Sequence, residues 1–338
     1  MLTRDDDALP HAKTQGRDWR ESYYCNFFDQ SSDLCGVFWQ GTRPNAGHGE
    51  SVFLLCDGAS DLIRSVDFKV PVTADVPEER RRNGSAEFTC IEPWKHWKVK
   101  FDREGNYFEV DWRQLSDVCD WEWEDLTQSK HFQIAGKVRG TGRVGGRKIE
   151  FTGYGERDRA WGDRNYGPLK VSFWTVAQFP DDVAAHAFAL LMDDGSYRLH
   201  GYLHQDGTTR GLARFEAETA YGGLMGPPES GRLRFVDDIG RSLDISSYQR
   251  KNHLAIGAAP KDGAQLGIDV SQSQSLMFLT LQRFKRADGV DGNGMIDFNC
   301  WKGNQPALIR AEAPPLYSTL YSYGRRRRMV DAAMPGVS

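Results

Sequence analysis

The sequence predicts an all-β fold class, with two antiparallel barrels or sandwiches in tandem. Runs of β-branched and aromatic residues recur along the chain, and short Asp-Gly or Gly-Gly turns separate them, which is typical of hairpins. The 338 residues suffice for about two ordinary domains. We therefore expect an N-terminal barrel at 19–162 and a C-terminal barrel at 163–324, with tails at 1–18 and 325–338.

Two hairpins are expected in the first half, each with a short Gly-containing turn: 88–101 with 106–112, and 131–144 with 147–155. Helical periodicity is hard to find along the chain. Only the first twenty residues and Trp112–Asp125 have modest helical character.

The second half is the most regular part of the chain. Its expected strands are 171–179, 183–192, 197–204 and 210–219, followed by hairpins at 233–248 and 276–301. In the strand YRLHGYLH, polar and aromatic side chains share one face: Arg198, His200, Tyr202 and His204. This face would either line a ligand-binding lumen or form a solvated outer surface.

Composition and charge exclude several classes of protein. A hydrophobic fraction of 39% and a net charge of −4 describe a globular protein without a nucleic-acid partner. The N-terminus is acidic where a signal peptide needs an apolar core, and the apolar runs are too short to span a bilayer. We expect a cytoplasmic protein with no transmembrane segment. Its six scattered cysteines are expected to be free thiols, and no metal site is expected.

Several motifs are better explained by structure than by chemistry. Gly140–Gly145 matches GxGxxG, but a strand follows it rather than a helix, so we interpret it as part of a hairpin. Asp288–Gly294 is interpreted as a hairpin tip rather than a calcium loop, and Arg325–Arg328 as a solvated tail. Four histidines have no Ser or Cys in an elbow-like turn nearby, so no hydrolytic triad is expected: His186, His200, His204 and His253.

The central stretch GYGERDRAWGDRNY (153–166) contains the candidate catalytic residues. Tyr154, Glu156 and Asp158 fall on one face of a strand. Two carboxyl groups and a phenol side by side suit proton transfer to or from carbon, because burial can hold one carboxyl protonated. Aromatic rings could then line the pocket and stabilise positive charge: Trp161, Tyr166 and Trp174.

A structural interpretation of this stretch stays open. Small lipocalin-type barrels often close one end with a Trp packed under an Arg. Trp161 lies among Arg157, Arg159 and Arg164, and Asp158 would then simply pair with an Arg.

The stretch GYGERDRAWGDRNYG resembles the signature G-x-G-x-R-D-H-S-W-G-x-R-D-W of the hydroxyneurosporene synthase and carotenoid hydratase superfamily, which includes AttH-like proteins. WRESYYCNFFD, GVFWQGTRPNAGHGE and HFQIAGKVRGTG resemble its bacterial branch, and the match runs from Trp19 to Trp301. The resemblance implies two tandem lipocalin-like (calycin) β-barrels with a hydrophobic cavity in or between them. It also implies hydratases of isoprenoid double bonds or cyclases of polyketides, with no metal or organic cofactor.

Within the motif, Asp158 occupies the place of a candidate proton donor, and four other positions match: Arg157, Trp161, Gly162 and Arg164. The motif's His is replaced by Arg159, which removes a natural base and would hold Asp158 ionised if the two pair. The other departures are Ala160, Asn165 and Tyr166.

These observations predict a cofactor-independent lyase or isomerase, of hydratase or cyclase type, acting on a terpenoid- or polyketide-like hydrophobic molecule. Asp158 would protonate the substrate, with Glu156 or Tyr154 relaying the proton. The expected substrate-binding residues are Arg157, Trp161, Arg164, Tyr166, Trp174, His200 and Tyr202. A non-catalytic carrier of lipophilic ligands and a cyclase acting by shape alone stay open as alternatives, and so does a homodimer.

Overall fold

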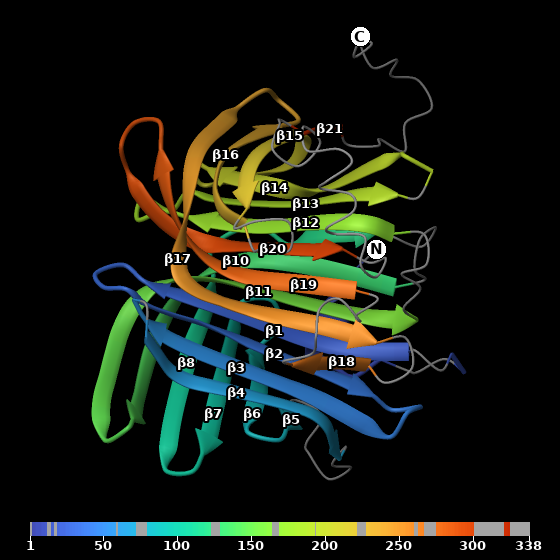
Figure 1. Cartoon of the computed structure of the whole chain (residues 1–338), viewed down its shortest axis with the longest axis vertical. Coiled ribbons are helices and arrows are strands. Elements are labelled where there is room, and N and C mark those ends of the chain that lie inside the picture. The colour runs from blue at the N-terminus through green and yellow to red at the C-terminus, as the bar shows by residue number, and fades with distance from the viewer. Residues whose placement is uncertain are drawn as a thin grey trace.

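Two antiparallel β-sheets, each curled into a barrel, make up most of the computed structural model (Figure 1). The structure describes residues 2–11, 15–16, 19–58, 60–71, 80–122, 129–163, 169–192, 194–221, 228–259, 263–266, 275–300 and 321–324. The predicted all-β fold class is confirmed.

Within the described residues, the first sheet has eleven strands in the order β4-β3-β2-β1-β11-β10-β8-β7-β6-β5, with β9 beside β10, so its barrel is nearly closed. The strands are β1 (Trp19–Asp29), β2 (Leu34–Arg43), β3 (His48–Asp57), β4 (Ser60–Pro71), β5 (Arg80–Asn83), β6 (Ala86–Glu92), β7 (His96–Arg103), β8 (Asn106–Gln114), β9 (Cys119–Glu122), β10 (Ser129–Val144) and β11 (Arg147–Asp163).

The second sheet has ten described strands in the order β14-β13-β12-β20-β19-β17-β16-β15-β21, with β18 beside β17, and pairing of β14 with β15 closes the barrel. The strands are β12 (Leu169–Gln178), β13 (Ala184–Met192), β14 (Tyr197–Gln205), β15 (Thr208–Tyr221), β16 (Pro228–Asp237), β17 (Ser242–Ala259), β18 (Gly263–Leu266), β19 (Ser275–Arg286), β20 (Asp291–Cys300) and β21 (Tyr321–Gly324).

Turn chemistry explains the hairpins. Gly145 and Gly146 have φ values of +55° and +80°, the left-handed conformation that a two-residue turn between β10 and β11 requires. The GxGxxG match is therefore part of a hairpin, as expected. The helical expectation for Trp112–Asp125 is wrong over its described part, because β8 extends to Gln114 and Cys119–Glu122 forms β9, both paired with β10.

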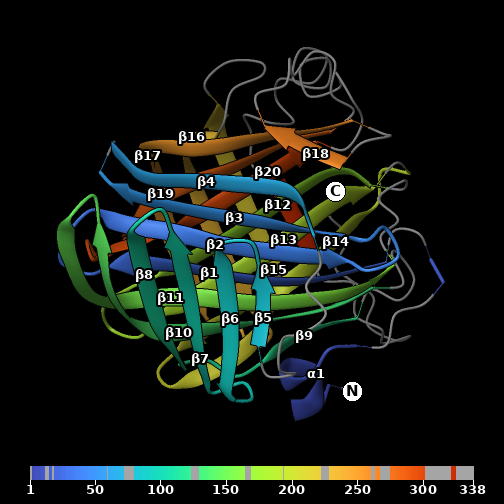
Figure 2. The same ribbon diagram turned by 90° about the horizontal axis from the view of Figure 1, so that it is seen from below.

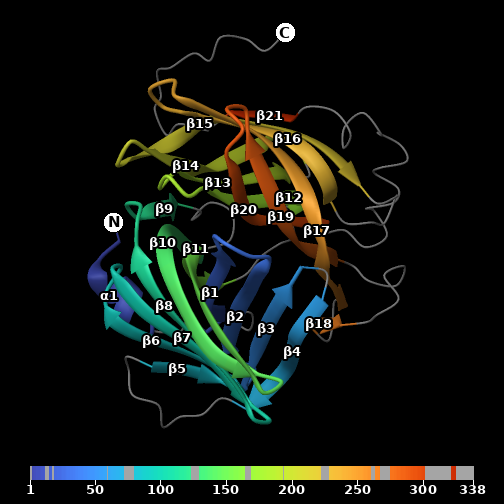
Figure 3. The same ribbon diagram turned by 90° about the vertical axis from the view of Figure 1, so that its left-hand side faces the viewer.

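Side chains pack in three apolar layers, which follow the alternation of the strands. Aromatic side chains fill the first barrel, where Phe38 and Phe53 stack with ring centroids 4.2 Å apart. Smaller residues such as Ala187 pack with phenylalanines in the second barrel. The third layer lies where the barrel walls meet, and it joins Tyr24 and Val52 to residues of the second sheet such as Trp174. Figure 3 shows the barrels stacked, with β1, β10 and β11 of the first facing the second.

The first residues, expected to be a tail, pack against the first barrel. The helix α1 (Arg4–Ala8) lies beside β5 and β6 at the edge of the first sheet (Figure 2). Asp7 at its end is fully buried and accepts a hydrogen bond from Trp97 Nε1 at 2.9 Å. Among the described residues, no helix is both long and apolar enough to cross a membrane.

Candidate active site at the junction of the barrels

The strand β11 presents different chemistry on its two faces. Tyr154, Glu156 and Asp158 share the face toward the second sheet, as the alternation of the sequence predicts. Arg157 and Trp161 share the opposite face, toward the interior of the first barrel. The motif is therefore divided between the junction and a barrel interior.

Glu156 is fully buried in a network that joins both sheets. Tyr202 from β14 donates its hydroxyl to Glu156 Oε2 at 2.6 Å, and His186 Nδ1 from β13 lies 3.2 Å from Oε1. The amide of Gln133, assigned from its partners, donates to Glu156 Oε1 at 3.2 Å and accepts from Trp174 Nε1 at 2.6 Å. Five side chains thus satisfy one another in a site without solvent.

The backbone also holds Glu156 in place. Its N–H donates to Asn26 Oδ1 at 2.7 Å. A Cβ at the preceding Gly155 would lie 2.2 Å from the Asn26 carbonyl oxygen, so β1 and β11 can approach this closely only with glycine there.

Burial favours the neutral forms of the two titratable groups that meet in this network, Glu156 and His186. Desolvation raises the pKa of Glu156 well above its usual value, the hydrogen bond from Tyr202 opposes the rise, and the charge of Asp158 adds to it. Burial likewise lowers the pKa of His186 well below its usual value. Both shifts favour a hydrogen bond between a carboxylic acid and a neutral imidazole over an ion pair between Glu156 and His186.

Asp158 lies next to this network but is less enclosed. Its residual exposure is 8%, against none for Glu156. Its ion-pair contact is with His131 Nε2 at 3.4 Å, while Arg157 and Arg159 bind other groups on the opposite face. The expectation that Asp158 pairs with a neighbouring Arg of β11 is therefore wrong for these two.

A third carboxyl group, Asp297 on β20, responds to the charge of Asp158. Burial raises the pKa of Asp297 to about 8, the hydrogen bond from Asn299 opposes the rise, and Asp158 adds to it. The charge of Asp158 thus raises the pKa of two buried carboxyl groups, Glu156 and Asp297.

Aromatic rings form the surroundings. Trp121 from β9 has its ring centroid 4.0 Å from that of His131, 4.7 Å from Phe188 and 4.8 Å from His200. Trp121 is fully buried, whereas its three neighbours are half-buried. Trp121 and these neighbours form a partly exposed aromatic cluster, in which His131 also contacts Asp158.

The expected substrate-binding residues fall into three groups. Trp174, Tyr202 and His200 lie at the junction; Trp174 packs edge-on to His186 at 5.2 Å, and His200 Nε2 contacts the Asp120 carbonyl oxygen. The YRLHGYLH face is therefore an outer face of the second barrel that the junction covers. Arg164 and Tyr166 lie outside the described residues.

Arg157 and Trp161 form a clasp on the other side of β11. Arg157 is fully buried, pairs with Asp7 at 2.7 Å and lies 4.5 Å over the ring of Trp97. Trp161 stacks on His11 at 3.8 Å and has Arg159 above it at 5.8 Å. The structure thus supports the structural interpretation for this half of the motif and does not place these two residues with Glu156.

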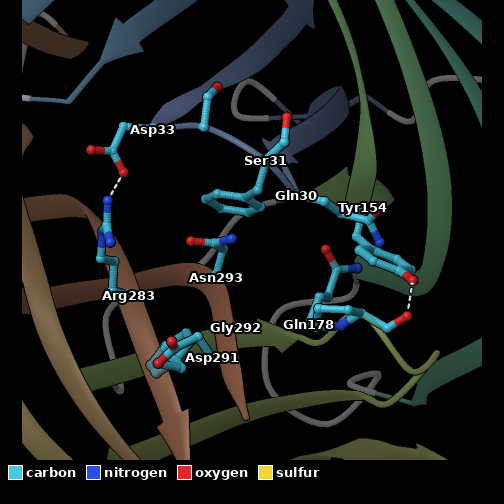
Figure 4. Close-up of a pocket in the computed structure, with 13 residues that line it drawn as sticks. Gln30, Ser31, Asp33, Tyr154, Gln178, Arg283, Asp291, Gly292 and Asn293 are labelled. Carbon is cyan, nitrogen blue, oxygen red and sulfur yellow. Dashed lines mark hydrogen bonds and ion pairs between the residues drawn. The ribbon is translucent and has the colours of Figure 1, made fainter.

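Tyr154 lies apart from the other two junction residues. Its hydroxyl donates to the Pro180 carbonyl oxygen at 2.7 Å, and its side chain lines a cavity that neither Glu156 nor Asp158 lines (Figure 4). The three residues share a face but not one pocket.

The sequence interpretation missed four polar residues of the site: His131, Gln133, His186 as a partner of Glu156, and Asp297. Gln133, His186 and Asp297 have a signal in the alternation of their strands, since each lies between two apolar neighbours, whereas His131 lies between Lys130 and Phe132. No local signal indicates that these outward faces meet. No described group of three or more His, Cys, Asp or Glu side chains is arranged to hold a metal ion.

Solved structures with the same architecture include three proteins. An AttH-like protein from Nitrosomonas europaea is 14% identical, with a TM-score of 0.65 over 89% of this chain and 97% of its own. CghA, solved with Sch210972, is 11% identical, with a TM-score of 0.63 over 88% and 97%. Kievitone hydratase from Nectria haematococca is 7% identical, with a TM-score of 0.56 over 89% and 95%. At these identities the likeness shows the shared fold.

No protein with a curated description matches this chain. One family model, described as a domain of unknown function, DUF7064, matches residues 4–299. The match spans both barrels and the junction. The chain therefore belongs to the DUF7064 family, and it has the tandem lipocalin-like fold of the AttH-like proteins.

Proposed function

We propose that this chain is a cofactor-independent lyase or isomerase, of hydratase or cyclase type, that acts on a hydrophobic small molecule at the junction of its barrels. The supporting observation is Glu156, a fully buried carboxyl group whose pKa is raised well above its usual value, beside the less enclosed Asp158. Kievitone hydratase, which shares the fold, carries a hydration reaction in its name.

In a hydration reaction one carboxyl group can act as the general acid and another as the general base. A protonated carboxylic acid transfers its proton to one alkene carbon, which forms a C–H bond and leaves a carbocation. Water then attacks the cation, and an ionised carboxylate accepts the proton that this water loses, so atoms and charge balance. Asp297, with its pKa raised to about 8, suits the acid, and Asp158 beside His131 suits the base.

In this proposal Glu156 is a proton reservoir rather than the group that meets the substrate. It has no exposed surface, and Tyr202 and His186 occupy its oxygens. A nonpolar molecule would approach Asp158 at the partly exposed aromatic cluster around Trp121, and the ring faces would stabilise a developing cation.

The experiment is incubation of the protein with kievitone and with isoprenoid alkenes in H2(18)O, followed by mass spectrometry. We expect an 18O-labelled hydrate, or an isomer of unchanged mass if the reaction is a cyclisation. Asp158→Asn should lower turnover at least 100-fold. Asp111→Asn, at a surface pair with His96, is the matched control and should leave turnover unchanged.

Two results would contradict the proposal. If Asp158→Asn keeps full turnover, Asp158 is not part of the mechanism. If the protein binds these molecules without converting them, and Trp174→Ala weakens that binding, the chain is a carrier of lipophilic ligands.

A further inference from the structure

A second polar feature of the junction is the cavity beside Tyr154. Its volume is about 400 Å3, and both barrels line it, with Phe28 and Ser31 from the first sheet and Gln178 and Asn293 from the second (Figure 4). The carboxyl groups of the proposed active site do not line it. The cavity is therefore a separate site.

Gln178 is the unusual group in this cavity. It is 2% exposed, and neither its Oε1 nor its Nε2 has a hydrogen-bond partner among the described residues. Figure 4 shows its amide directed into the space between Asn293 and Tyr154. A buried amide without partners destabilises a fold, so an apolar side chain of similar size would serve packing better. A bound molecule that supplies both partners would remove this cost.

The other lining groups narrow the chemistry of that molecule. Phe28 and Phe284 are each 1% exposed and give apolar walls. The charged groups lie at the rim, where Asp33 and Arg283 form an ion pair with side-chain exposures of 38% and 57%. A deep part lined by amides and rings, with the charges outside it, favours an uncharged ligand.

We propose that this cavity binds a small neutral molecule carrying an amide, lactam or urea group. Such a group has a donor and an acceptor side by side, and these match Oε1 and Nε2 of Gln178 in a two-point contact. The ring of Phe28 covers the rest of the molecule. This proposal does not rest on the proposed catalytic function.

The test uses 2-pyrrolidone as a lactam probe and glycerol as a polyol probe, with binding followed by ligand-observed NMR. We expect the full-length protein to bind 2-pyrrolidone and not glycerol, and Gln178→Met to weaken lactam binding at least tenfold. Gln205→Met is the matched control, because Gln205 Oε1 also lacks a partner but lies away from the cavity, and it should bind as the unchanged protein does.

Thermal unfolding gives a second readout that does not depend on a ligand. If the Gln178 amide serves binding, Gln178→Met removes an unsatisfied buried group, and Tm should rise by about 2 °C or more. A fall in Tm would show a structural role and would overturn the proposal. Equal lactam binding by Gln178→Met, no lactam binding by the unchanged protein, or tighter binding of glycerol would overturn it as well.

Discussion

The protonation of Glu156 can be tested by replacing it with glutamine, its neutral isostere. The amide oxygen can still accept from Tyr202, and the NH2 group can donate to His186, which stand at 2.6 Å and 3.2 Å from the carboxyl oxygens. The NH2 group cannot accept the hydrogen bond that Gln133 donates to Oε1. Because the pKa of Glu156 is raised on folding, its contribution to stability is complete below the unfolded value and is lost as pH rises.

The magnitude follows from linkage. Each pH unit between the unfolded pKa and the folded pKa changes the relative free energy of unfolding by about 1.4 kcal/mol. Glu156→Gln should therefore gain stability over the unchanged protein as pH rises from 5 to 7, by about 1.4 kcal/mol for each pH unit that lies below the folded pKa. A loss of stability from altered hydrogen bonds is the same at both pH values, so it does not contribute to this difference between pH 5 and pH 7.

The assay is urea unfolding at pH 5, 6 and 7, followed by tryptophan fluorescence. Glu21→Gln is the control with the opposite expectation. Burial alone would raise the pKa of Glu21, but the hydrogen bond from His11 and the charge of Arg159 lower it. Losing this buried carboxylate should cost about 3–5 kcal/mol at pH 7, with little change down to pH 5.

A stability difference between Glu156→Gln and the unchanged protein that does not vary with pH would refute this reasoning. It would show that Glu156 has the same charge in the folded and unfolded states. A cost at pH 7 as large as that of Glu21→Gln would show that Glu156 is an ionised partner of a charged His186.

Two other substitutions test neighbouring groups. Asp297→Asn should gain stability relative to the unchanged protein as pH rises from 5 to 8, and the gain should then level off, because the folded carboxyl group also ionises above its raised pKa of about 8. Differential scanning calorimetry at several pH values measures this difference in stability. A difference that keeps widening above pH 9 would contradict the expectation. Asp7→Asn should lower the free energy of unfolding by about 3–5 kcal/mol in urea, because it leaves the fully buried Arg157 without its charged partner at 2.7 Å. A loss below about 1 kcal/mol would show that the surrounding rings alone hold the guanidinium group.

The hairpins were predictable because their signals are local. Gly145-Gly146 marks one turn, and Asp288-Gly289 marks another, with φ of +90° at Gly289. The closure of the first barrel was not predictable in this way. It needs β1 beside β11, so that Trp19 pairs with Asp163, and no short-range pattern specifies a contact across that much chain.

In the candidate site, too, the local features were predictable from the sequence and the long-range contacts were not. Alternation along β11 puts Glu156 and Asp158 on one face, and alternation along β14 puts Tyr202 on an outward face. The hydrogen bond between Glu156 and Tyr202 depends on how two separate sheets meet, which neither strand encodes. Arg157 and Trp161 were assigned to substrate binding from the motif, although the same alternation places them on the opposite face of β11.

The two faces of β11 also bear on the choice between an enzyme and a carrier. On the inner face the buried charge of Arg157 has an opposite charge beside it, as a structural ion pair needs. On the junction face burial raises the pKa of Glu156 well above its usual value; the charge of Asp158 adds to the rise, and the charge of His131 opposes it. A container for lipophilic molecules needs apolar walls, and a leucine or methionine at position 156 would supply them without desolvating a carboxyl group. A buried carboxyl group with a raised pKa beside a second carboxyl group is suited to moving a proton, which is the basis on which we propose catalysis rather than storage.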